Sequence, residues 1–430
     1  MPKQIHLAAH YPGSNNHTVW SDPSAGSYIE FESFARLART AERGKFDFLF
    51  LAEHLRLRQV DGQIFELDVA GRPDSLALFS ALSSVTKLLG LVGTYNTTFS
   101  EPFELARQLA TLDHLSAGRA AGNLVTTARI HGENFRRGNF ISEQDGQHYE
   151  RGKEFLRAMC QMWDGGAADF THHGKYFDIE GTFSVPTPPQ GRPVIMEAGN
   201  SDKGRDFAAA TADAIFWRGG TFEAGQEFYA DIKQRMAKYS RNKDQLKIMG
   251  ASSFVLGDTD EEAKELNNLV RRQRVSPQYA ITMAETAWGR DLSGYDPDGP
   301  LPDIEPELGD NGTTRPRAMI AGPDPTKTVR KWREVAKEKN LSLREMIMEV
   351  TLPAAFVGSP QTIASEINRF VQSDACDGFI LWPPVVPDGL DEFVDKVVPL
   401  LVEQGVFRDE YTGTTLREHL GLQPVRPGSN

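Results

Sequence analysis

The chain has 430 residues, of which 40% are hydrophobic and 25% charged, the composition of an ordinary globular protein with a large core. The formal net charge is -12, and no basic tract provides the electrostatic footprint of a nucleic-acid binder. No apolar run reaches the roughly 18 residues of a membrane span, and the N-terminal stretch MPKQIHLAAHYPG lacks the hydrophobic region of a signal peptide. We therefore expect a cytoplasmic protein that binds neither nucleic acid nor membranes.

Short apolar runs alternate with amphipathic helices along the first part of the chain. Apolar strands that alternate with helices are typical of βαβ units and of a parallel sheet covered on both faces. The expected strands are 4–11, 46–54, 89–97 and 118–127, and the expected helices are 29–44, 75–88, 101–116 and 149–163.

The segment 171–193 interrupts this rhythm with turn residues and short alternating runs, which predict a β-hairpin. Strand-helix pairs then resume over 193–212, 214–239 and 246–275, and a last set covers 359–372, 377–384 and 389–404. A count of about eight strands indicates a TIM (β/α)8 barrel rather than an open doubly wound sheet. We expect one α/β barrel domain over 1–422, with insertions at about 168–192 and 276–355 and a disordered tail at 423–430.

Function in such a barrel sits at the C-terminal ends of the strands. The residues expected there are mostly polar and uncharged, without the carboxylate pair of a glycosidase or a recognisable Ser-His-Asp arrangement. They are His10, Glu53, His54, Thr94, Asn96, Asn123, Thr126, Thr127, Gly199, Asn200, Ser201 and Arg218.

Metal and thiol chemistry find little support in the sequence. His6 and His10 could share a face of the first strand, but a zinc site needs further ligands. Cys160 and Cys376 are far apart, and neither belongs to a C-x-x-C pair. We expect no metal site and no catalytic cysteine.

The stretch GNSDKGR, residues 199–205, follows an apolar strand and opens a helix with a glycine in its first turn. Glycine at that place costs about 1 kcal/mol relative to alanine, which suggests that something approaches the backbone closely. One interpretation is a phosphate bound at the helix N-terminus. The alternative is that Ser201 only caps its own helix. The stretch lacks the G-K-[ST] of a nucleoside-triphosphate loop.

Four long blocks of the sequence resemble one protein family. The blocks are FDFLFLAEH, LLGLVGTYNTTFSEPFELARQLATLDHLSAGRAAGNLVTT, HGKYFDIEGTFSVPTPPQGRPVIMEAGNSDKGRDFAA and DGFILWPPVVPDGLDEFVDKVVPLLVEQGVFRDEYTGTTLREHLGL. The family is that of the nitrilotriacetate and dibenzothiophene-sulfone monooxygenases, a branch of the bacterial luciferase-like flavin monooxygenases. The resemblance extends from residue 4 to about residue 422.

This resemblance implies a luciferase-like TIM barrel that uses reduced FMN (FMNH2) as a co-substrate. The reduced flavin would come from a separate NAD(P)H:FMN reductase and react with O2 to a flavin hydroperoxide, which oxygenates a small organic molecule at nitrogen, sulfur or carbon. The flavin would carry the chemistry, and the family commonly forms homodimers or homotetramers. The alternatives are a deazaflavin-dependent hydride-transfer enzyme and a non-catalytic flavin-binding protein.

The resemblance also implies roles for individual residues. The family motif A-G-x-S-x-x-G-R is matched by residues 198–205, with Ser201 on the FMN phosphate and glycines 199 and 204 allowing backbone approach. Other matching positions face the flavin ring or reach its phosphate. The implied cofactor-binding residues are Glu53, Thr94, Asn96, Asn123, Tyr149, Gly199 and Ser201.

Three departures from the family pattern carry consequences. Glu53 replaces a usual aspartate, and Asp145 stands where a histidine would reach the phosphate, a contact that His148 could supply instead. Gly122 replaces a tryptophan, which predicts a larger cavity beside the cofactor and a bulkier substrate.

Substrate contacts are expected from the loop after the first strand and from the end of the sixth strand. The candidates are His10, Asn16, His17, Trp20 and Arg218, although the loop residues could equally be structural and Arg218 could form a salt bridge to a neighbouring loop. The segment 289–326, rich in Pro, Gly and Asp, is predicted to be a lid or a mobile excursion.

Overall fold

The computed structural model of the chain describes residues 2–12, 18–19, 22–53, 73–126, 147–307, 324–352 and 355–425. It also describes the backbone of two short antiparallel strands, β3 (Gln59–Val60) and β4 (Gln63–Ile64). The predicted substrate residues Asn16, His17 and Trp20 lie outside the described residues, as do His54, Thr127 and Asp145.

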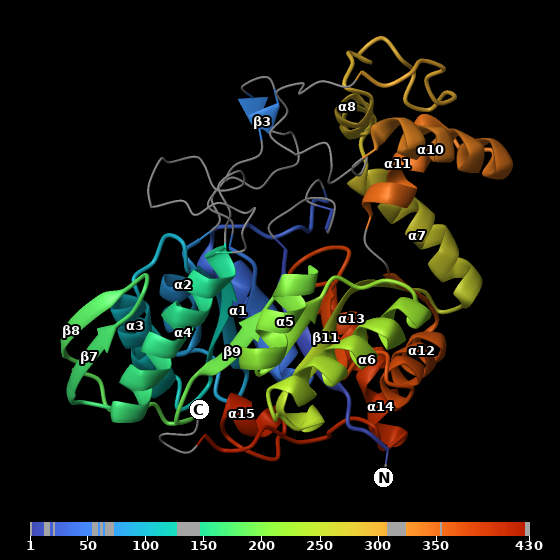
Figure 1. The fold of residues 1–430 in the computed structure, drawn as a ribbon. Coiled ribbons are helices and arrows are strands. Elements are labelled where there is room, and N and C mark those ends of the chain that lie inside the picture. Colours follow the sequence, from blue (N-terminus) through green and yellow to red (C-terminus); the bar gives the residue numbers. More distant parts are fainter. Residues whose placement is uncertain are drawn as a thin grey trace.

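Eight parallel strands close into a barrel, as predicted (Figure 1). Going round the ring, each strand pairs with the next, and the pairing of β10 with β11 closes it. In ring order the strands are β1 (His6–Tyr11), β2 (Phe48–Leu51), β5 (Gly90–Asn96), β6 (Ala120–Val125), β9 (Val194–Glu197), β10 (Ala214–Trp217), β11 (Lys247–Leu256) and β13 (Gly378–Trp382). A further strand, β12 (Ala355–Gly358), pairs with the last residues of β11.

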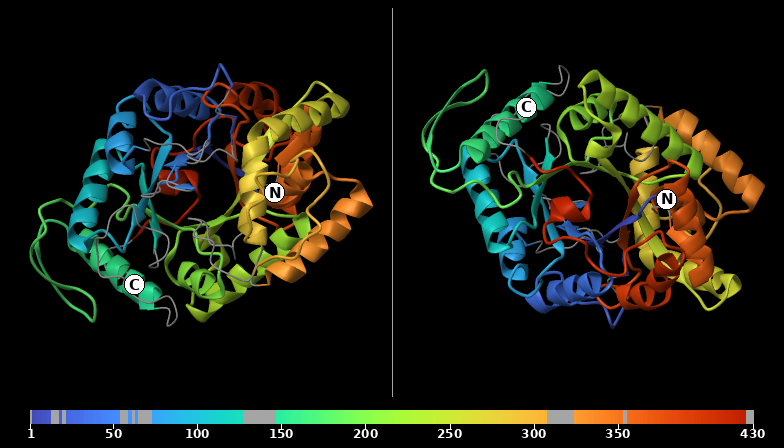
Figure 2. Two further views of the ribbon diagram at one scale, coloured as in Figure 1. Left: turned by 90° about the horizontal axis from the view of Figure 1, so that it is seen from above. Right: turned by 90° about the horizontal axis from the view of Figure 1, so that it is seen from below.

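Helices surround the strands on the outside, so that the barrel wall is covered all round (Figure 2). They are α1 (Phe31–Arg43), α2 (Ser75–Leu82), α3 (Pro102–Leu115), α4 (Gln147–Gly165), α5 (Asp202–Thr211), α6 (Phe222–Lys238), α12 (Pro360–Gln372), α13 (Leu390–Lys396) and α14 (Val398–Glu403). A short 3-10 helix, η1 (Lys243–Gln245), precedes β11. No helix among the described residues is long and apolar enough to cross a membrane.

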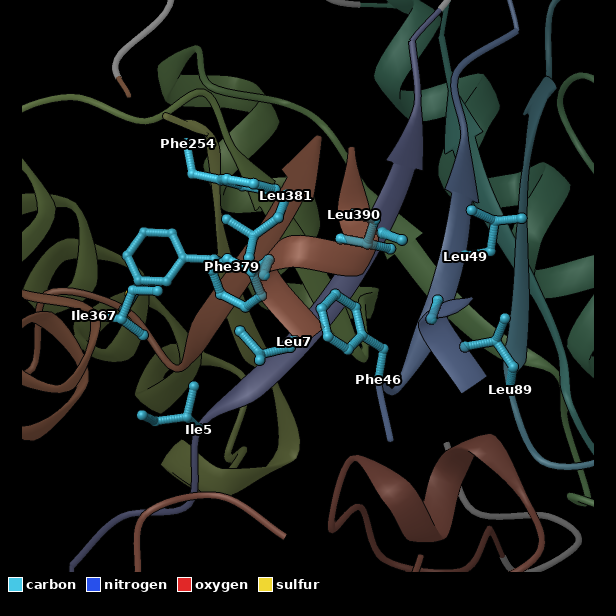
Figure 3. Packing of buried hydrophobic residues seen from close by; sticks show 14 of the residues in the cluster. Ile5, Leu7, Phe46, Leu49, Leu89, Phe254, Ile367, Phe379, Leu381 and Leu390 are labelled. Carbon is cyan, nitrogen blue, oxygen red and sulfur yellow. The ribbon is translucent and has the colours of Figure 1, made fainter. Parts of the chain in front are cut away.

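The alternation of side chains along each strand builds two apolar layers. Outward residues such as Leu7, Leu49 and Leu381 pack beneath the helices (Figure 3). Inward residues fill the barrel, among them Ala8, Phe48, Phe50, Val92, Ala121, Val194, Met196, Ala214, Met249 and Ile380.

The C-terminal helix α15 (Leu416–His419) closes the N-terminal end of the barrel (Figure 2, right). Leu416, Leu420 and Leu422 join the inward cluster. Arg417 holds the segment in place through a two-fold ion pair with Asp213, at 2.9 and 3.1 Å. Only the opposite end, where the strands finish, is left for a site.

The hairpin predicted at 171–193 is formed by β7 (Asp169–His173) and β8 (Asp178–Thr182). Its turn is held by the Glu154 carboxylate of α4, which accepts the backbone N–H groups of Lys175, Tyr176 and Phe177 at 2.9–3.1 Å.

The late insertion carries helices and a core of its own. α7 (Asp260–Arg274) leaves the barrel, and α8 (Pro277–Trp288), α10 (Pro325–Lys339) and α11 (Leu343–Thr351) follow. Trp288, Trp332 and Ile347 belong to an apolar cluster separate from the barrel clusters. The predicted excursion is described up to residue 307, and its first part packs on this core: the Trp288 indole N–H donates to the Ile304 carbonyl at 3.0 Å. Residues 308–323 lie outside the described chain, as does the end of the tail at 426–430.

Candidate active site at the C-terminal mouth of the barrel

The inward positions nearest the strand ends form the floor of the site. His10 lies two residues beyond the inward Ala8, and Thr94 and Asn123 lie two residues beyond the inward Val92 and Ala121. Because side chains alternate between the two faces of a strand, all three point into the barrel. The structure thus brings together polar residues that are 29 to 113 positions apart in the sequence.

Thr94 and Asn123 form a buried hydrogen-bonded pair in register on β5 and β6. The Thr94 hydroxyl donates to the Leu51 carbonyl at 2.8 Å, and the Asn123 amide N–H donates to Thr94 Oγ1 at 3.1 Å. Asn123 Oδ1 is buried and has no hydrogen-bond partner among the described residues. Buried polar atoms nearly always have a hydrogen-bond partner, so this oxygen is available to accept a hydrogen bond from a ligand. Asn96, the last residue of β5, has the same inward parity.

Aromatic side chains line another part of the mouth, on β1, β2, β10 and β13. The His10 imidazole lies between Phe50 and Trp382, with ring centroids 5.3 and 5.8 Å away, and Phe216 stacks on Phe50 at 5.7 Å. His10 Nδ1 donates to the Phe50 carbonyl at 3.0 Å, which fixes the tautomer and the orientation of the ring. The mouth therefore combines a buried polar pair with a cluster of aromatic rings that are tilted relative to one another.

The helix α5 begins beside this mouth, and Ser201 caps it. Ser201 Oγ accepts the Gly204 N–H at 3.1 Å, so Ser201 caps the helix, which is compatible with both interpretations of the sequence. The Tyr149 hydroxyl lies 3.0 Å from the same oxygen. His148 lies against Tyr149, with ring centroids 4.2 Å apart. Two hydroxyls and the free N–H groups of a helix N-terminus thus converge at one place, which suits an anion.

Glycines 199 and 204 serve to pack the strand end against the helix. A Cβ on Gly199 would come within 2.7 Å of the Gly204 Cα, and a Cβ on Gly204 within 2.7 Å of the Gly199 Cα. The close approach inferred from a glycine in the first helical turn is therefore that of another backbone. Asn200, between them, donates from Nδ2 to the carbonyls of Ala198 and Phe216, at 3.0 and 3.3 Å, and so joins the ends of β9 and β10.

One expectation from the sequence is wrong, and the predicted cofactor role of Glu53 stays a prediction. The Glu53 carboxylate accepts the Ser75 N–H at 2.9 Å, so it anchors the start of α2, and burial raises its pKa. The prediction that Gly122 enlarges the cofactor cavity is wrong. A Cβ there would meet Leu109 at 3.2 Å and Leu124 and Tyr95 at 3.5 Å, because the position faces α3 and not the barrel interior.

Arg218 lies exposed just after β10, and its backbone N–H donates to Asn200 Oδ1 at 3.4 Å. Its side chain forms no ion pair with any residue that the structure describes, and both predicted roles of Arg218 stay predictions. No group of three or more His, Cys, Asp or Glu residues that could hold an ion occurs in the described part of the chain.

A model of the luciferase-like monooxygenase family matches residues 14–377 of the chain. The chain belongs to that family. The N-acetyl-S-(2-succino)cysteine monooxygenase of Bacillus subtilis (strain 168) is 37% identical over 98% of this chain and 97% of its own length. The nitrilotriacetate monooxygenase component A of Aminobacter aminovorans is 35% identical over 96% and 94%, respectively. Among solved structures, the EDTA monooxygenase of Chelativorans sp. BNC1 has a TM-score of 0.76 and 28% identity, covering 99% of this chain and 100% of that one.

These comparisons confirm the family inferred from the sequence, and this luciferase-like protein is a flavin-dependent monooxygenase. One buried group near the start of α5 was missed at the sequence level. Glu197 ends β9 with its Oε1 buried and without a partner among the described residues, and burial raises its pKa well above the ordinary value. The feature of the sequence that could have indicated this group is the position of Glu197, a single acidic residue between the apolar run VIM and the A-G motif.

The monooxygenase also contains a cavity of about 370 Å³ outside the barrel wall, between the ends of β10 to β12 and α12. Its lining includes Trp217, Gly219, Phe356, Phe370 and Phe379. Phe379 and Phe370 belong to the outward layer, so this cavity lies on the other side of the wall from His10 and Thr94. It is not the mouth described above.

Proposed function

We propose that this monooxygenase is the oxygenase component of a two-component system. It would take reduced FMN from a separate NAD(P)H:FMN reductase and use O2 to oxygenate a small organic molecule. The relative from Aminobacter aminovorans, whose name includes "component A", supports the two-component arrangement. The observation that carries the proposal is the unsatisfied acceptor Asn123 Oδ1 at the mouth of a barrel of this family.

The residues present fit FMN in two respects. Asn123 Oδ1 offers an acceptor to a ring N–H, and the stacked side chains of Phe50 and Phe216 offer apolar surface to a tricyclic ring. Ser201, Tyr149 and the N-terminus of α5 offer donors to a phosphate. Thr94, Asn96 and Gly199 complete this set, and Glu53 contributes through α2.

When bound, reduced flavin supplies the activation of O2 and the transfer of one oxygen atom. The chain's own residues bind, orient and exclude water. Thr94 holds the Asn123 amide through Nδ2, which leaves Oδ1 directed at the ligand. The aromatic side chains around His10 would limit the access of water to the reacting region, as an oxygen-transfer reaction requires.

The proposed partners are the reductase, O2 and the organic substrate. Self-association into a homodimer or homotetramer and residence in the cytoplasm remain predictions. His10, Asn16, His17, Trp20 and Arg218 remain the proposed substrate contacts; of these, His10 lines the mouth and Arg218 follows β10.

Rapid mixing of the protein and anaerobically reduced FMN with oxygenated buffer tests the proposal. We expect the absorbance of oxidised flavin to return much more slowly than it does for free reduced FMN. Return at the rate of free flavin would overturn the oxygenase assignment and favour the deazaflavin enzyme. Tight retention of oxidised FMN through purification, together with unaltered reoxidation, would instead favour a flavin-binding protein.

A further inference from the structure

Arg274, the last residue of α7, is a buried cation without a counter-ion in the part of the chain that the structure describes. The residue is 3% exposed, and its one hydrogen bond runs from Nη1 to Ser253 Oγ at 3.4 Å. Nε and Nη2 are buried and have no partner among the described residues. Burial lowers the pKa of Arg274 to about 10, so the group is still charged at neutral pH.

Other buried arginines of this chain are compensated. Arg119 is 2% exposed, and its guanidinium donates to four backbone carbonyls and to the Thr86 hydroxyl. Arg417 forms the two-fold ion pair with Asp213. A buried charge that is neither paired nor fully hydrogen-bonded is costly. Arg274 therefore requires a partner that is not among the described residues.

The contact with Ser253 places the guanidinium at the mouth of the barrel. Met249 faces the interior, and Ser253 lies four residues further along β11, on the same face. Ser253 is in register with Trp382, whose ring meets His10 edge-on at 5.8 Å. In the closed ring of strands, β11 lies across from β5, which carries Thr94. In Figure 1, α7 rises on the side of the barrel toward the end at which the strands finish.

The two unsatisfied atoms also have a defined geometry. Nε–H and Nη2–H form one edge of the guanidinium, with parallel N–H bonds that match the two oxygens of a carboxylate. A neutral hydroxyl or amide would leave one of these N–H donors without an acceptor, or would leave the positive charge without a counter-charge. The free edge thus selects for a planar anion.

We propose that Arg274, held by Ser253, is the subsite that binds a carboxylate of the substrate. This inference rests on the proposed function, because it assigns a substrate class to the same mouth. The substrate is accordingly a small organic acid, held by its carboxylate at β11 with its oxidisable centre directed toward the wall formed by β5 and β6.

The flavin phosphate is the other anion that could meet this arginine. Ser201 and Tyr149 lie at the end of β9 and the start of α4, on the far side of β10 from Arg274. The two sources differ in their consequence: loss of Arg274 would weaken acid binding in the first case and FMN binding in the second.

The test compares Arg274→Gln with Arg272→Gln, a matched change on the exposed side of the same helix, where Arg272 pairs with Glu345. Succinate and its neutral isostere succinamide serve as probes, and thermal midpoints of the flavin-free protein are measured against probe concentration. A ligand that binds only the native state raises the midpoint. We expect succinate to stabilise the wild type and Arg272→Gln, and succinamide to stabilise neither.

For Arg274→Gln we expect succinate affinity to fall by at least about tenfold, the usual loss when a charged hydrogen bond is removed. Its ligand-free midpoint should equal or exceed that of the wild type, since an uncompensated charge is gone. Arg274→Lys keeps the charge without the paired N–H edge and should bind succinate more weakly than the wild type.

Three results would overturn the subsite: no stabilisation of the wild type by succinate, equal stabilisation by succinamide, or an Arg274→Gln variant that retains succinate binding. A lower ligand-free midpoint of Arg274→Gln would mark a structural arginine, and weakened FMN binding alone would mark a phosphate ligand. Because these measurements contain no oxygen chemistry, they can fail or succeed independently of the rapid-mixing experiment.

Discussion

Replacing Ser201 with alanine should separate the two roles that this hydroxyl has in the structure. Ser201 Oγ caps α5 by accepting the Gly204 N–H at 3.1 Å, and it is the proposed donor to the FMN phosphate. Loss of a serine cap typically lowers the free energy of unfolding by about 1 kcal/mol. A hydrogen bond to a charged group contributes about 1.5–3 kcal/mol.

The expected loss of flavin binding is at the lower end of that range. The Tyr149 hydroxyl, 3.0 Å from Ser201 Oγ, and the N–H groups of α5 remain available to the phosphate. We therefore expect Ser201→Ala to weaken reduced-FMN binding by about 1–2 kcal/mol, or roughly 5- to 30-fold.

The assay is anaerobic titration of the protein with reduced FMN and with reduced riboflavin, which lacks the phosphate. Ser359→Ala is the matched control, because Ser359 caps α12 in the same way, by accepting the Thr362 N–H. Both variants should lose similar stability, and only Ser201→Ala should lose affinity for FMN. An unchanged affinity for FMN, or an equal loss for riboflavin, would refute the phosphate site.

Three further predictions test the flavin contact, a buried carboxyl group and the packing of β6 on α3. Asn123→Leu removes the unsatisfied acceptor and should lower flavin affinity with little change in the free energy of unfolding; a titration in which the flavin affinity is unchanged would contradict the ring contact. Burial holds the pKa of Glu197 well above 4.5, so the native state loses stability as the pH rises from about 4.5 through the raised value. Urea unfolding should accordingly show Glu197→Gln to be more stable than the wild type at pH 8 and equal to it in acid, whereas parallel curves at all pH values would disprove this account. Gly122→Trp would overfill the contact with Leu109 and should lower the free energy of unfolding by about 1–3 kcal/mol in the same assay; a stabilised variant would instead reveal empty space.

Much of the fold and part of the site could be predicted from the sequence because those features depend on near neighbours in the chain. The strand-helix rhythm, the hairpin and the cap at Ser201 are each encoded within a few residues, through apolar periodicity and turn or capping side chains. The strand-end position of Thr94, Asn96 and Asn123 followed from the barrel architecture, which places the C-terminal strand ends together.

Tertiary structure decided what those residues face and which distant groups meet them. Glycine 122 and Asn123 are adjacent, yet one packs on α3 and the other points into the barrel, since the strand register fixes which side is inside. The Glu53 carboxylate accepts a backbone N–H at the start of α2. Gly204, in the first turn of α5, packs against Gly199, which follows β9. Arg274 ends the helix α7 that follows β11, and it reaches Ser253 because that helix packs beside the same strand. Such contacts depend on how each strand packs against the helix that follows it, and the local pattern of residues does not fix that packing.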